Sequence, residues 1–193
     1  MTPIPAVSNL SSRLFAKGTR ACRTLSMKTL RCAKNFGLGA AAGTFICLPL
    51  HYGVYFIYPQ LEGLPDQLMD QTPLVENIYN RIVWKEGILS PILEEILFRG
   101  LLQNIILKKP LKLVDAKITK CFRIGCASAL FAVAHLGNRG SYPDNYIKRQ
   151  VIVALFMGSF LGMIKESKLG LSGAIGAHIG FNIFGIITTR LMR

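Results

Sequence analysis

The chain has 193 residues, of which 51% are hydrophobic and only 17% are charged, and its mean hydropathy is +0.38. Ordinary soluble domains are about 45–50% apolar, so this composition favours a membrane protein. The formal net charge of +13 comes in blocks beside apolar runs, where anionic lipid headgroups attract Lys and Arg. A nucleic-acid partner is therefore not expected, whereas a lipid bilayer is. The five cysteines form no C-x-x-C pair and predict no disulfide framework.

Residues 1–35 form a basic segment that contains no acidic residue. This composition is typical of a cytosolic arm or of an organellar transit peptide. We favour the arm, since the first long apolar run follows it directly and resembles an anchor that stays in place. Its basic residues are Arg13, Lys17, Arg20, Arg23, Lys28, Arg31 and Lys34.

The rest of the chain, residues 36–193, contains apolar runs long enough to be membrane-spanning helices. About 20 apolar residues cross the hydrocarbon core of a bilayer. The sequence therefore predicts an all-α, multi-pass transmembrane helical bundle of about five spans in one membrane-embedded domain. These spans are expected at 36–58, from 82 or 88 to 107, 122–137, 151–164 and 169–189.

The loops between these spans differ in charge, and this difference predicts the orientation of the chain. Lys and Arg are more frequent in the arm, in the 108–120 loop and in the 165–168 turn than in the other connecting segments. Basic loops remain on the cytoplasmic side of membranes. We therefore expect an integral multi-pass membrane protein with a cytoplasmic N-terminus.

The second predicted span carries three charged residues, Glu94, Glu95 and Arg99. Unpaired charges at the centre of a spanning helix cost roughly 2.5–3.5 kcal/mol each, so such residues are usually functional. Glu95 and Arg99 are four residues apart and share a helix face, whereas Glu94 points about a quarter-turn away. Arg99 is thus expected to neutralise Glu95 and to leave Glu94 as a general base, although a purely structural ion pair is about as plausible for Glu95 and Arg99 alone.

Further polar residues in the third and fifth spans complete a candidate catalytic site. Its residues are Glu94, Glu95, His135, His178 and Asn182, with Arg99 and Phe131 as structural support. His135 could hold the water that Glu94 activates. His178 and Asn182 are one helical turn apart and can donate hydrogen bonds to a developing oxyanion. Taken singly, each histidine is more often a packing residue and Asn182 an interhelical contact, so the prediction depends on their occurring together. Phe131 is expected in the core.

A metal site is an alternative interpretation of the same residues. Glu94, His135 and His178 contain the donors of a two-histidine, one-carboxylate zinc site with an open position for water. The sequence has no H-E-x-x-H motif, and its spacing gives zinc no specific support. We therefore assign no cofactor and favour a metal-free glutamate mechanism.

Three motifs in order resemble those of a known family. Glu94 to Arg99 matches E-E-x-x-x-R, Phe131 to His135 matches F-x-x-x-H, and His178 to Asn182 matches H-x-x-x-N. They are similar to the motifs of the CAAX prenyl protease and bacteriocin-processing family (CPBP or Abi family) of intramembrane endopeptidases. The resemblance covers roughly residues 88–186.

The resemblance implies a role for each motif residue. It implies Glu94 and His135 as water-activating residues, His178 and Asn182 as the oxyanion site, and Glu95 and Arg99 as structural support. It also implies a cavity that opens to the cytosolic side. This orientation agrees with the one that we expect from the distribution of Lys and Arg among the loops. The implied substrate is a peptide or protein near the membrane surface, possibly of CAAX type, although this chain has fewer expected spans than eukaryotic prenyl-protein members.

Two other functions compete with proteolysis. The scaffold could serve as a non-proteolytic membrane binding or bacteriocin-immunity protein, but the intact motif residues favour the enzyme. A proton-coupled transporter could use the same buried carboxylates. The sequence shows no inverted repeat or paired broken helices, which makes this the weakest of the three.

Overall fold

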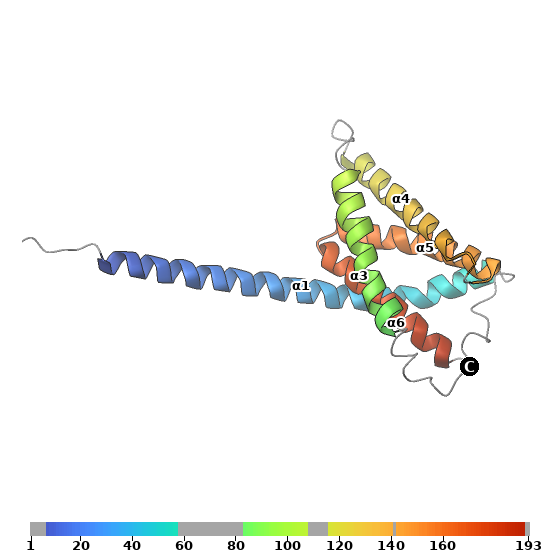
Figure 1. The fold of residues 1–193 in the computed structure, drawn as a ribbon, viewed down its shortest axis with the longest axis horizontal. Helices are drawn as coiled ribbons and strands as arrows, with labels where there is room; N and C mark the ends of the chain where they lie inside the picture. Colours follow the sequence, from blue (N-terminus) through green and yellow to red (C-terminus); the bar gives the residue numbers. More distant parts are fainter. Residues whose placement is uncertain (1–6, 58–82, 108–115, 141, 192–193) are drawn as a thin grey trace, which may run out of the picture. The chain divides into compact units, whose positions relative to one another are not determined.

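A computed structural model describes residues 7–57, 83–107, 116–140 and 142–191 of the chain. Its contacts divide the chain into two compact units, Met1–Lys34 and Asn35–Arg193. The helical elements are α1 (Val7–Ile57), η2 (Val83–Leu89), α3 (Ser90–Glu95), η3 (Ile96–Ile106), α4 (Ala116–Ala134), η4 (His135–Asn138), α5 (Asp144–Glu166) and α6 (Gly170–Leu191). Among the described residues no strand occurs, and the predicted all-α fold is confirmed (Figure 1).

Three helical stretches of the described residues are long and apolar enough to cross a membrane, namely Thr24–Val54, Asp144–Glu166 and Gly170–Thr188. They correspond to the first, fourth and fifth predicted spans. The α1 helix extends far into the basic arm, and α5 begins seven residues before the predicted start at 151. The predicted third span is also helical, but α4 begins at Ala116 and includes Lys117, Lys120 and Arg123 before its apolar part.

The predicted second span is helical from Val83 to Ile106, but its geometry changes along its length. One turn and a half of α-helix, α3, lies between two π-helical stretches, η2 and η3. Ser90 and Pro91 are the first two residues of α3, and Leu89 before them already has helical φ and ψ angles of −69° and −48°, so the helix continues through this point. Pro91 lacks a backbone N–H, and the wider π turn before it accommodates this loss. The whole stretch η2–α3–η3 is one rod that carries Glu94, Glu95 and Arg99.

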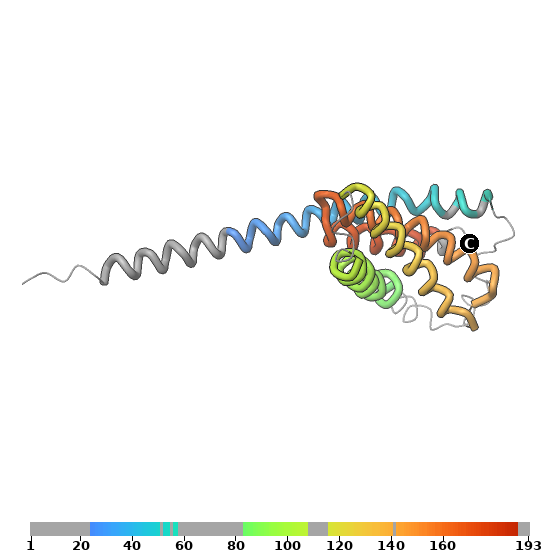
Figure 2. Tube along the Cα trace, turned by 90° about the horizontal axis from the view of Figure 1, so that it is seen from above, coloured from blue at the N-terminus to red at the C-terminus, as the bar shows by residue number. Residues whose placement is uncertain are grey.

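The α1 and α6 helices touch through small residues, backbone against backbone. A Cβ atom added at Gly39 would collide with the backbone of Gly173, and one added at Gly43 would collide with that of Ala177. The same holds for Gly176 against Phe36. Figure 2 shows α1 and α6 crossing in this region. Without a hydrophobic driving force in lipid, such close approach supplies the van der Waals contact that holds helices together.

A hydrophobic core lies between α1, α5 and α6. Its buried side chains are Cys47, Val54, Val153, Met157, Leu161, Ile164, Ala174, Ala177 and Phe181. A second, smaller cluster joins α4 to α5 through Phe131, Ala132 and Ala154, with Phe98 of η3 packed against it. The η2–α3–η3 rod also packs directly on α6, where Gly87 of η2 meets the Ile183 side chain, and the polar residues lie along this contact.

The glycine contact predicts a difference between two alanine variants of α1. Gly43→Ala is expected to lower the free energy of unfolding by about 1–3 kcal/mol, because the methyl group forces α1 away from α6. Gly37→Ala is the matched control, since nothing lies within 4 Å of its Cβ position, and the helical propensity of Ala makes it neutral or stabilising. Thermal unfolding in detergent micelles measures both. Equal melting temperatures for the two variants would contradict the contact.

Candidate active site

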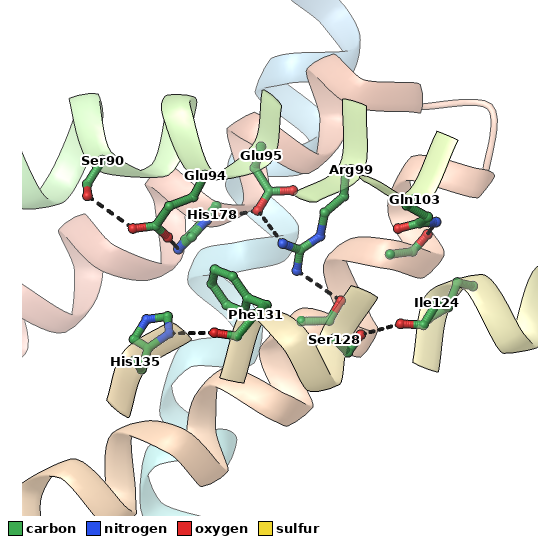
Figure 3. Close-up of polar contacts among 12 residues, drawn as sticks. Ser90, Glu94, Glu95, Arg99, Gln103, Ile124, Ser128, Phe131, His135 and His178 are labelled. Carbon is green, nitrogen blue, oxygen red and sulfur yellow. Dashed lines mark hydrogen bonds and ion pairs between the residues drawn. The ribbon is translucent and has the colours of Figure 1, made fainter. Parts of the chain in front are cut away.

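The two neighbouring glutamates of α3 occupy different environments. The Glu95 side chain is completely buried, whereas that of Glu94 is 30% exposed. The Ser90 hydroxyl, one turn earlier, donates a 3.0 Å hydrogen bond to Glu94 Oε1. Figure 3 shows Ser90, Glu94 and His135 towards one side of the cluster and Gln103 with Ile124 towards the other. Glu94 is therefore a partly exposed carboxylate at the edge of the cluster.

Arg99 neutralises Glu95 inside the bundle. Its Nη1 lies 3.2 Å from Glu95 Oε1, and both side chains are fully buried. Its Nη2 donates a 3.1 Å hydrogen bond to the carbonyl oxygen of Gly158 on α5, and its Cζ lies 4.5 Å from the centre of the Phe131 ring. The predicted pairing of Arg99 with Glu95 is present, and the guanidinium is further stabilised by a cation–π contact.

His178 of α6 connects the two glutamates. Its Nδ1 lies 3.0 Å from Glu95 Oε1, and its Nε2 lies 3.7 Å from Glu94 Oε2. A carboxylate can only accept hydrogen bonds, so Nδ1 carries a hydrogen. Glu95 thus orients the ring, and the Nε2 atom faces Glu94.

His135 is half-buried and lies just after the last residue of α4. Its Nδ1 donates a 2.8 Å hydrogen bond to the carbonyl oxygen of Phe131, which leaves the lone pair of Nε2 free to accept one when the ring is neutral. The Phe131 ring stacks edge-on with both histidines, at centroid distances of 4.8 Å to His135 and 5.7 Å to His178. The aromatic ring thus separates and positions the two imidazoles.

Asn182 lies one turn beyond His178 and contacts the rod at a different point. Its Nδ2 donates a 2.9 Å hydrogen bond to the backbone oxygen of Glu86, two turns before Glu94. A carboxamide nitrogen has two hydrogens, so one donor of Asn182 is in use and one is left. The structure gives Asn182 a contact with the helix of Glu94 and gives no direct contact with Glu94 itself.

Among the described residues, no group of three or more His, Cys, Asp or Glu side chains is arranged to hold a metal ion. The set considered above, Glu94, His135 and His178, forms no such group. Two hollows in the described part lie near this cluster's helices, one lined by Trp84, Ile88 and Ile92 among others and one by Leu136, Asp144 and Ile152 among others, and none of the four candidate catalytic side chains lines either.

Sequence reasoning missed several residues that complete this cluster. Gln103 is fully buried and donates to Glu166 Oε1 at 3.0 Å, and it approaches the Gly162 carbonyl oxygen at 3.4 Å. Gln103 follows Arg99 by four residues, as Arg99 follows Glu95, so all three lie on one helix face. This spacing is the sequence feature that could have predicted Gln103 as part of the cluster. Gly158 and Gly162 of α5 let α4 approach closely and also present their carbonyl oxygens to Arg99 and Gln103.

These observations define an integral membrane protein whose helices enclose a cluster of carboxylates and imidazoles. Residues 82–184, more than half of the chain, match the type II CAAX prenyl endopeptidase Rce1-like family, and the chain belongs to this family. No curated protein and no solved structure gives a match. The family membership points to a protease and agrees with the resemblance found in the sequence motifs.

Proposed function

We propose that the protein is an intramembrane endopeptidase in which Glu94 and His135 activate a water molecule for attack on a peptide bond. The observation that carries this proposal is the contrast between the two glutamates. Glu95 is buried and held by Arg99 and His178, whereas Glu94 is partly exposed and held only by a hydroxyl and a more distant imidazole. A general base needs a carboxylate that is accessible to water and is not occupied by an arginine.

The two histidines then take different roles. The neutral His135 ring accepts a hydrogen bond from the water through Nε2, since its Nδ1 is committed to the Phe131 carbonyl oxygen. His178 donates to the oxyanion through Nε2 only when doubly protonated, because its Nδ1 hydrogen is committed to Glu95. The remaining Nδ2 hydrogen of Asn182 is the second oxyanion donor, since the other is donated to the Glu86 carbonyl oxygen.

The substrate is a peptide segment of a membrane-associated protein or peptide, and processing of the CAAX type is one form of this reaction. The family name supports this substrate class. Purified protein in proteoliposomes, incubated with membrane-anchored peptides, tests the proposal, with mass spectrometry locating the broken bond. Binding of these peptides without cleavage would support the non-proteolytic alternative instead.

We further propose that this hydrolysis needs no metal ion, since the donor atoms described above do not form a metal site. Cleavage is expected to persist after exhaustive treatment with chelators, and the purified protein is expected to contain less than one equivalent of zinc. A matched sample treated with the chelator already saturated with metal controls for other effects of the reagent. Loss of cleavage that only added zinc restores would overturn this part of the mechanism.

A further inference from the structure

A second polar cluster lies at the end of α5, outside the candidate active site. Its centre is Glu166, whose Oε1 accepts hydrogen bonds from Gln103 Nε2 at 3.0 Å and from Lys165 Nζ at 2.8 Å. Arg123 Nη2 of α4 lies 3.4 Å from the other carboxylate oxygen, and these charged side chains are largely buried. The Glu166 cluster therefore ties η3 and α4 to the last turn of α5.

Gln103 connects this cluster to the candidate site along the rod. Its Nε2 also donates to the Gly162 carbonyl oxygen at 3.4 Å, and four residues earlier Arg99 Nη2 donates to the Gly158 carbonyl oxygen at 3.1 Å. The two donors are four residues apart on the rod, and the two acceptors are four residues apart on α5. One register of the rod against α5 therefore satisfies both bonds, and the bond from Gln103 to Glu166 is made in the same register.

Burial makes this register hard to leave. The Gln103 side chain is fully buried, as are those of Arg99 and Glu95 before it, and Figure 3 shows the three in a row along the rod. An amide nitrogen has two hydrogens, and both are used here, by Gly162 and by Glu166. A buried donor that loses its acceptor carries the full cost of its desolvation. Displacement of the rod along α5 is therefore opposed at Gln103 as well as at Arg99.

The same register determines where the rod meets α6. Glu95, four residues before Arg99, lies 3.0 Å from His178 Nδ1 and 3.2 Å from Arg99 Nη1. The α5 and α6 helices share one hydrophobic core, which contains Leu161 of α5 and Ala177 of α6. His178 is thus placed by the packing of α6 on α5, whereas the carboxylate that orients its ring is placed by the rod.

We propose that Gln103 and Glu166 are positioning residues of the candidate active site. They hold the rod on α5 in the register that brings Glu95 to His178 Nδ1, and they act through Arg99 and Glu95. In the part of the chain that the structure describes, neither forms a hydrogen bond or ion pair with any of the four candidate catalytic side chains. Their effect on peptide cleavage rests on the proposed function, whereas their effect on the His178 ring does not.

Gln103→Met tests this proposal, because methionine has nearly the shape of glutamine and offers no hydrogen to Gly162 or Glu166. Misplacement of groups by about 1 Å can cost roughly 10²-fold in rate, so kcat per folded molecule is expected to fall about 10–100-fold. KM should change little, since the oxyanion donor acts on the transition state. Asn104→Leu is the matched control, because Asn104 is the next residue and its exposed side chain bonds Lys165 instead. It should retain the wild-type kcat.

Nitrogen NMR of isotope-labelled histidine separates positioning from stability. The chain has only three histidines, and His178→Gln assigns the ring signals of His178. In Gln103→Met these signals are expected to shift, because the Nδ1 hydrogen bond to Glu95 changes. They should stay in place in Asn104→Leu and in Val54→Ala, which loses core packing between α1, α5 and α6 but keeps the bonds of the rod to α5.

Variants of Glu166 repeat the test from α5. Glu166→Gln should retain most of kcat, since its amide oxygen still accepts the bond from Gln103, whereas Glu166→Met should lose kcat as Gln103→Met does. Glu166→Met also serves as the test where Gln103→Met does not fold.

Unchanged His178 signals in both methionine variants would overturn the proposal, as would a loss of kcat in Val54→Ala as large as theirs. If the wild-type protein cleaves no peptide, the proposed function fails, and the NMR signals still decide whether Gln103 positions His178.

Discussion

Glu94→Gln is expected to lower kcat for peptide cleavage by about 10²–10⁴-fold with little change in KM. The amide has nearly the shape of the carboxylate and can still accept a hydrogen bond from Ser90, but it cannot take a proton from water. Initial rates over a range of peptide concentrations, measured in proteoliposomes, separate kcat from KM.

Glu86→Gln is the matched control for this variant. Glu86 lies two turns before Glu94 on the same helix, its side chain is 53% exposed, and its ionised contact is with the exposed Lys85. It should retain the wild-type rate, because only its backbone oxygen contacts Asn182. Full activity of Glu94→Gln, or an equal loss in both variants, would refute Glu94 as the base.

Arg99→Met is expected to destabilise the protein by about 3–5 kcal/mol. The substitution leaves Glu95 charged in a fully buried position, and uncompensated buried charges carry costs of this size. It also removes the hydrogen bond to the Gly158 carbonyl oxygen. Unfolding in mixed micelles with increasing SDS measures the change in free energy.

A double variant distinguishes the lost pair from lost packing. Glu95→Leu combined with Arg99→Met removes both charges, and most of the lost stability is expected to return. Activity should not return, since His178 then lacks the carboxylate that orients its ring. A double variant as unstable as Arg99→Met alone would show that the ion pair is not the source of the effect.

Most of the fold was predictable because membrane helices are specified by local composition. Apolar runs of sufficient length define α5 and α6 to within a few residues, apart from the charged first turns of α5. The helical start of α4 could not be read from hydropathy, because Lys117, Lys120 and Arg123 stand in its first turns and Arg123 pairs with Glu166 from another helix. Such a long-range pairing has no local signal.

The candidate site was predictable as a set of residues but not as an arrangement. The i, i+4 spacing predicts the contact of Glu95 with Arg99, and this contact is present. The spacing says nothing about which glutamate His178 approaches more closely, and the 3.0 Å contact is with Glu95 rather than with the proposed base. The roles of Glu94, His135, His178 and Asn182 stay predictions until variants are tested.

The part of α1 that packs against α6 lies before the part of the chain that matches the family. The homologous stretch begins at residue 82, whereas the compact unit begins at Asn35. A shortened protein starting at residue 82 would keep every motif residue and still lose the helix that shields the glycine face of α6 beside His178. Inactivity of this shortened protein would therefore report incomplete assembly and would say nothing about the chemistry of the motif residues.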